Sequence, residues 1–202
     1  MSIVKKLMEK VAGLVFGEGE EDEESGILSK KKKKDTRVIG LVSEVDEEKI
    51  AELLQAILFL KESGTDPIEF YISTYGGNAD DMFCLYDMMN HVKEKIEIHT
   101  IGIGKVMSAG VLILAAGTKG KRKISKNCRI MLHSVIAGNH GALHNLVNEM
   151  EAIHSLQETY ISGLAENTKM TKTQIKKMLE RKVNIYLSAE EAITLGIADE
   201  IM

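Results

Sequence analysis

The chain has 202 residues, of which 44% are hydrophobic and 28% are charged, and its formal net charge is −4. This length suits one domain with a full core, and the composition is ordinary for a soluble globular protein. The mild acidity gives no sign of nucleic-acid binding, and no apolar run approaches the roughly 20 residues of a membrane span, so we expect neither a nucleic-acid nor a membrane partner.

The first 35 residues differ from the rest in composition. Residues 1–16 carry apolar residues at roughly helical spacing, but not the long apolar core of a secretory signal. Residues 18–24 are almost wholly acidic, and residues 30–34 are five consecutive lysines. Because blocks of like charge repel and resist packing, we predict a charged, mobile arm over residues 1–35 and one domain over residues 36–202. The arm is a solvated tail, a contact arm, a pore-lining loop or a processed leader.

Strand and helix signals alternate from Val38 onward. Asp46 is a suitable N-cap, and the apolar residues between Ile50 and Leu58 are spaced to lie on one helix face. This alternation predicts an α/β fold with a mainly parallel sheet and crossover helices. Strands are expected at residues 38–42, 68–72, 96–103 and 128–133, and helices are expected after Asp46 and over residues 108–116 and 141–165.

The remaining metal and redox signals are weak. Cys84 and Cys128 are the only cysteines, too few for a disulfide framework, which favours the reducing cytoplasm; we expect both to be buried. His140 and His144 have the i, i+4 spacing of metal ligands, but no third ligand is evident. No phosphate-binding glycine loop is present. We therefore expect no metal and no cofactor.

Three features fall where a parallel sheet places its functional residues, at the carboxyl ends of strands. They are the pair Gly76-Gly77, then Ser108, then His133. A serine hydroxyl becomes a nucleophile when a base accepts its proton, and it needs amide donors for the oxyanion that the attack creates. His133 is a candidate base, while the amides of the glycine pair and of Ala109 are candidate donors.

Each feature also has an ordinary structural interpretation. A glycine pair after a strand commonly makes a turn, a serine that opens a helix commonly caps it, and a histidine at a strand end is commonly held by structural hydrogen bonds. Their occurrence in order, each at a strand end, favours a serine hydrolase.

The segments around these residues match the motifs of one family. The motifs are a Gly-Gly turn after a strand, a nucleophile block, an Ala-Gly-x-x-Gly-Lys-Arg block, an Asn-x-Arg-x-Met-Ile-His block and a late Ser-Ala-Glu-Glu-Ala helix. From about Arg37 to its end the chain resembles ClpP, the proteolytic subunit of the ATP-dependent Clp protease, as a divergent member. The matching segments are Ser73 to Gly77, Gly104 to Val111, Ala116 to Arg122, Asn127 to His133 and Ser188 to Ala192.

This resemblance implies a fold, an activity and partners. The fold would be ClpP/crotonase-like, with the long helix from Gly141 as a protruding handle. Ser108 would be the nucleophile and His133 the general base of a serine endopeptidase, with Gly77 and Ala109 donating the oxyanion-hole amides. The chain would form a homo-oligomer of two stacked heptameric rings, and an ATP-hydrolysing AAA+ Clp unfoldase would deliver unfolded polypeptides. No cofactor is implied.

The sequence departs from the family pattern at four positions. Asn184 aligns with the aspartate of the family's Ser-His-Asp triad. An asparagine oxygen can accept the His Nδ1–H but brings no charge, and the equivalent Asp→Asn change in a well-known protease lowers turnover by about four orders of magnitude. Val183 stands in place of an arginine, and Ser134-Val135 in place of Gln-Pro.

Two alternatives follow. Asn184 favours a catalytically weak or inactive ClpP-like ring subunit with a structural or regulatory role. The related crotonase-type fold acts on acyl-CoA thioesters with a similar oxyanion hole, but the Ser108 and His133 pair argues against that chemistry.

Overall fold

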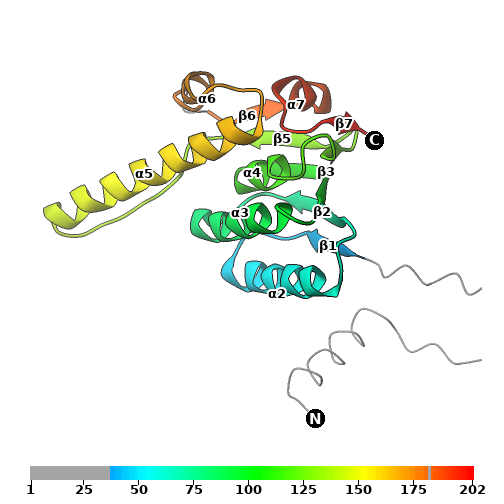
Figure 1. The fold of residues 1–202 in the computed structure, drawn as a ribbon. Coiled ribbons are helices and arrows are strands. Elements are labelled where there is room, and N and C mark those ends of the chain that lie inside the picture. The colour runs from blue at the N-terminus through cyan, green and yellow to red at the C-terminus, as the bar shows by residue number, and fades with distance from the viewer. Residues whose placement is uncertain (1–36, 182) are drawn as a thin grey trace, which may run out of the picture. The chain divides into compact units, whose positions relative to one another are not determined.

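The computed structural model describes residues 37–181 and 183–202; the predicted arm over residues 1–35 lies outside the described residues. The described part is a seven-stranded, mostly parallel sheet with six helices (Figure 1). The predicted α/β class with a mainly parallel sheet is therefore confirmed.

Most element boundaries lie close to those expected from the sequence. Asp46 caps the first described helix by accepting a hydrogen bond from the Lys49 amide at 2.8 Å. The helices are α2 (Glu47–Ser63), α3 (Ala79–Lys93), α4 (Ala109–Ala115), α5 (Leu143–Asn167), α6 (Lys172–Leu179) and α7 (Ala189–Leu195). The strands are β1 (Val38–Leu41), β2 (Ile68–Thr74), β3 (Ile98–Met107), β4 (Lys123–Ile124), β5 (Arg129–Leu132), β6 (Ile185–Leu187) and β7 (Glu200–Ile201).

Strand β3 is the centre of the sheet and pairs with two different strands on one side. Its first half pairs with β4, which in turn pairs with β7. Its last three residues pair in parallel with β5, in the register Met107↔Met131. The one antiparallel pair joins β5 to β6, with Leu132 opposite Ile185. The carboxyl ends of β2, β3 and β5 are thereby brought to one edge.

A single apolar core lies between the sheet and its helices. All seven residues of α4 are buried, so this helix is the centre of the helical layer. Gly163 of α5 lets that helix approach α4 closely, since a Cβ there would lie 3.2 Å from the Leu112 methyl carbons. Every described helix is too short or too polar to span a bilayer.

A buried arginine fastens the carboxyl end of the chain to this core. Arg122 is 4% exposed and donates through Nε to Asp199 Oδ2 at 2.8 Å and through Nη1 to the Ala115 and Asn167 carbonyls. Burial alone would raise the pKa of the Asp199 carboxyl, but its hydrogen bonds with Arg122 and with two backbone amides hold that pKa below its usual range. The ends of α4 and α5 and strand β7 are thus joined at one side chain.

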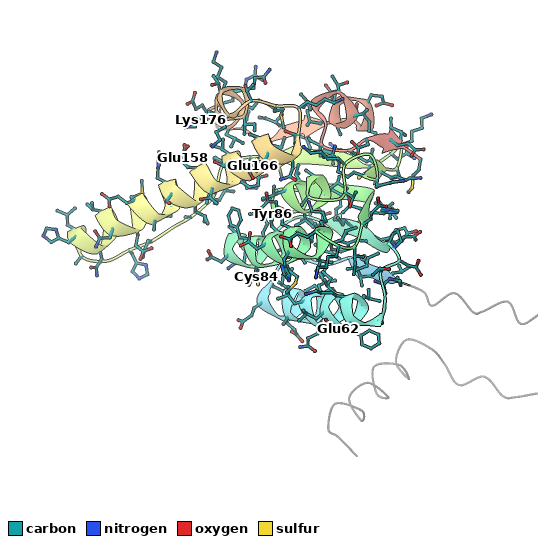
Figure 2. All side chains as sticks on the ribbon, viewed as in Figure 1. Glu62, Cys84, Tyr86, Glu158, Glu166 and Lys176 are labelled. Atoms are coloured by element: carbon teal, nitrogen blue, oxygen red, sulfur yellow. The ribbon has the colours of Figure 1, made fainter. Side chains whose placement is uncertain are left out.

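Helix α5 extends away from the rest of the described part, as the predicted handle does (Figure 1). Only its second half packs, with buried residues that begin at Tyr160. The ion pair between Glu158 and Lys176, at 2.8 Å, joins this half to α6 (Figure 2). The apolar residues Ile136, Leu143, Val147 and Met150 are all exposed, on the outer half and the segment leading to it.

One burial prediction was wrong, and one apolar residue of α2 is more exposed than its helical spacing suggests. Cys84 is exposed, because α3 turns Met82 and Leu85 into the core and leaves the cysteine between them on the solvent side. Leu58 is 43% exposed, because α2 buries Ile57 and Leu60 instead. Cys128 is buried as expected, and burial raises the pKa of its thiol to about 11.

Candidate active site

Ser108 occupies a strained backbone conformation between β3 and α4. Its φ of 54° and ψ of −121° make it the only non-glycine residue of positive φ within residues 37–181 and 183–202. Such a conformation costs of order 1–3 kcal/mol and persists only where the surroundings impose it. Although Ser108 is at the N-cap position, its side chain makes no capping hydrogen bond. The ordinary interpretation of this serine as a helix cap is therefore not supported.

The main chain of Ser108 is fixed by hydrogen bonds from both sides. Its amide donates to the Met131 carbonyl of β5 at 2.8 Å. Its carbonyl accepts from the Tyr160 hydroxyl of α5 at 3.1 Å and from the Val111 amide at 3.0 Å. Tyr160 is buried, and burial raises the pKa of its phenol, so the hydroxyl keeps its proton and remains a donor.

The glycine pair after β2 lies directly against the serine. A Cβ on Gly76 would lie 2.6 Å from the Ser108 Cβ and 2.9 Å from the Met107 carbonyl oxygen, and its φ is 100°. Gly77 bridges to Val45 and is packed so closely against that backbone that a side chain would collide with it. Only glycine fits here, which explains the motif.

Two backbone amides near Ser108 are free to bind an anion. The Gly76 amide donates to Thr74 Oγ1 at 3.0 Å and the Asn78 amide to the Val45 carbonyl at 2.8 Å. The Gly77 amide between them has no acceptor among the described residues, and the same holds for the Ala109 amide at the start of α4. A helix N-terminus favours negative charge, so these amides are suited to the predicted oxyanion-hole role.

His133 lies one residue beyond β5 and near the serine. Its Nδ1 is 2.5 Å from the Ser134 carbonyl oxygen. A carbonyl can only accept, so Nδ1 carries the proton and Nε2 of the neutral ring is left unprotonated, as a general base requires. The structure shows Ser108, His133, Gly77 and Ala109 together in the lining of one cavity of about 520 Å³.

Asn184 does not belong to that lining. Extending the antiparallel register of β5 and β6 by one residue places Asn184 opposite His133. Yet Asn184 is exposed, and within the described part of the chain no hydrogen bond joins it to His133 or joins Ser108 to His133. The Nδ1 proton is directed to Ser134 instead.

The cavity also contains residues that the motifs did not indicate. Tyr75 is 64% exposed, and the Lys105 ammonium lies 4.5 Å from its ring centroid. Asp80 and Tyr160 line the cavity as well. Apolar periodicity alone places Tyr160 on an inward face, but no sequence signal indicates that its hydroxyl reaches Ser108. Within residues 37–181 and 183–202, no group of three or more His, Cys, Asp or Glu side chains could hold a metal.

Comparison with known proteins shows the family of this chain. The model of the Clp protease family matches residues 21–202. The "ATP-dependent Clp protease proteolytic subunit 1" of Prochlorococcus marinus (strain MIT 9312) is 34% identical over 167 residues, which cover 82% of this chain and 84% of that protein. The protein of the same name from Prochlorococcus marinus subsp. pastoris (strain CCMP1986 / NIES-2087 / MED4) is 33% identical over 82% of this chain and 83% of its own length. Because the family model and these relatives span most of its length, the chain belongs to the Clp protease family.

Proposed function

We propose that this chain is the proteolytic subunit of a Clp-type protease and hydrolyses peptide bonds through an acyl-serine intermediate. The observation that carries the proposal is the strained Ser108, which shares one cavity with His133 and with the free amides of Gly77 and Ala109. Family membership supports peptide substrates over acyl-CoA thioesters.

The geometry supports a two-step reaction. The Ser108 hydroxyl attacks the peptide carbonyl while His133 Nε2 accepts its proton, and the Gly77 and Ala109 amides stabilise the oxyanion. His133 then gives the proton to the leaving amine. His133 Nε2 then accepts a proton from a water molecule as the water attacks the acyl-serine. The same proton passes to Ser108 Oγ as the acyl–oxygen bond breaks and the acid leaves. Because Nδ1 is bound to the Ser134 carbonyl, the ring enters the cycle in the required tautomer.

The proposal includes an assembly. The relatives are named as subunits of an ATP-dependent Clp protease, so we propose that this chain forms stacked rings, two of seven subunits each, that receive unfolded polypeptides from an AAA+ Clp unfoldase in the cytoplasm. The exposed apolar residues Leu143, Val147 and Met150 of α5 support a role for this handle in ring contacts, since clustered exposed apolar side chains mark interaction surfaces.

A second function is favoured by the position of Asn184. This residue carries no charge and makes no hydrogen bond to His133 among the described residues. A subunit whose histidine lacks a carboxylate partner loses most of the stabilisation of its imidazolium. The chain would then serve as a weakly active or inactive member of a ring.

Hydrolysis of a fluorogenic peptide by assembled wild-type, Asn184→Asp and Ser108→Ala proteins tests both functions. We expect measurable hydrolysis by the wild type, none above background by Ser108→Ala, and a gain of at least tenfold in kcat for Asn184→Asp, because the carboxylate stabilises the imidazolium. Correctly assembled wild-type and Asn184→Asp rings that both fail to hydrolyse the peptide would contradict the peptidase and support the structural role.

A further inference from the structure

The cavity beside Ser108 is mostly apolar but contains one carboxylate. Its lining has no lysine or arginine, and its only acidic side chain is that of Asp80. Its larger apolar side chains are those of Met82, Phe83, Val135, Ile136, Ile153 and Leu156. A substrate side chain that enters beside the serine therefore meets apolar walls and a negative charge.

The Asp80 carboxylate is available to a ligand. Asp80 lies in the first turn of α3, where its amide donates to the side chain of the capping residue Asn78 at 2.7 Å. Its own carboxylate makes no hydrogen bond or ion pair with any described residue, and the residue is exposed. It is fixed by the helix backbone but not neutralised by a neighbour.

Asp80 belongs to a small cluster of acidic residues. Burial first, and then repulsion from Glu47, Asp46 and Asp80, raise the pKa of the Asp81 carboxyl, which shows that these four carboxylates lie close together. Asp80 is the one among them that lines the cavity. The Lys105 ammonium lies over the ring of Tyr75, and Lys105 is not part of the cavity lining.

We infer that Asp80 determines the substrate class of this site: the cavity accepts a side chain with an apolar stem and a cationic end, lysine or arginine, and disfavours an acidic one. The apolar walls take the methylene stem, and the carboxylate at the exposed margin attracts the charged end. This inference rests on the proposed peptidase function, with the cleaved bond following the residue that enters the cavity.

Three fluorogenic peptides that differ only before the cleaved bond provide the test: one has norleucine, one lysine and one glutamate. Norleucine has the stem of lysine without the charge, so the lysine-to-norleucine ratio of kcat/KM isolates the charge effect. We expect this ratio to fall about tenfold in Asp80→Asn, which keeps the size of the side chain. Asp81→Asn is the matched control, because it removes the same charge from the same helical turn outside the lining. There we expect the ratio to stay within about twofold, because Asp81 does not line the cavity and solvent screens its charge from a side chain bound there.

The outcomes separate the inference from the function on which it rests. If the wild type hydrolyses none of the peptides, the peptidase proposal fails. If it hydrolyses them and the ratio is the same in the wild type and Asp80→Asn, the role of Asp80 is overturned. If Asp80→Asn and Asp81→Asn lower the ratio equally, the preference comes from the general acidity of the surface, and the assignment to Asp80 is overturned as well.

Discussion

At the scale of single residues, the backbone of Ser108 is the least ordinary feature of the described part. A residue with a side chain rarely adopts positive φ, and the ψ of −121° takes Ser108 outside even the left-handed helical region. Two hydrogen bonds hold this conformation. The Ser108 amide donates to the Met131 carbonyl, and the Tyr160 hydroxyl donates to the Ser108 carbonyl. They direct the hydroxyl-bearing side chain toward the cavity lining it shares with His133.

This strain predicts an unusual order of stability. Ser108→Gly should be more stable than Ser108→Ala by about 1 kcal/mol. Glycine adopts this conformation without a steric penalty, whereas the Cβ of alanine keeps that penalty. Urea unfolding of the two variants measures the difference. An ordinary N-cap also favours glycine over alanine, by several tenths of a kcal/mol. Equal stabilities, or a more stable alanine variant, would therefore show that Ser108 is not strained.

The sequence was sufficient to indicate which residues come together but not how they are held. The positions of Gly77, Ser108 and His133 at strand ends place them at one edge of a parallel sheet. The acceptor for His133 Nδ1 is a backbone carbonyl, that of Ser134, and every residue has one. No residue type could have signalled that contact, whereas the motif alignment drew attention to Asn184 instead.

At the scale of elements, α5 connects the protruding handle to Ser108. Its inner half packs on α4, and its Tyr160 hydroxyl reaches the Ser108 carbonyl at 3.1 Å. The helix that extends outward therefore also contacts the strained turn at Ser108. A change in how α5 packs would be transmitted to that turn through one hydrogen bond.

Removing this hydrogen bond should weaken catalysis more than folding. We expect Tyr160→Phe to lower stability by about 1 kcal/mol, the usual net value of one hydrogen bond. Its kcat should fall about fivefold or more while KM changes little, because the serine turn is less well fixed and the cavity keeps its walls. Peptide kinetics at a temperature where the variant remains folded make the measurement. Tyr186→Phe is the control, since Tyr186 is half-exposed and does not line the cavity. A Tyr160→Phe enzyme with unchanged kcat would contradict the positioning role.

Element boundaries were predictable where local chemistry determines them. The Asp46 cap is present as expected. The end of β3 was not predictable, because it runs on to Met107 only through pairing with β5, which lies further along the chain. The exposure of Cys84 was likewise not predictable from local sequence, because tertiary packing decides which face of α3 is buried.

At the scale of the whole molecule, the proposed catalytic groups and the proposed assembly surface adjoin one another, because Ile136 and Ile153 of the handle region line the cavity. The cavity lies at the carboxyl ends of the strands, and the exposed apolar residues lie on the outer half of α5. In the proposed rings, subunit contacts would cover the exposed apolar residues of α5, and the cavity would remain open to substrate. The sequence indicated both through family motifs, whereas the chemistry of the cavity wall, including Asp80, required the fold.

The most direct test is the mass of the assembled protein after treatment with a peptidyl phosphonate that reacts with activated serines. The mechanism predicts one adduct per chain, located by peptide mapping on Ser108. The adduct should be absent in Ser108→Ala and much slower to form in His133→Ala, since the base that activates the hydroxyl is gone. An assembled ring that forms no adduct on Ser108, or forms it as quickly without His133, would contradict a catalytic serine at this site.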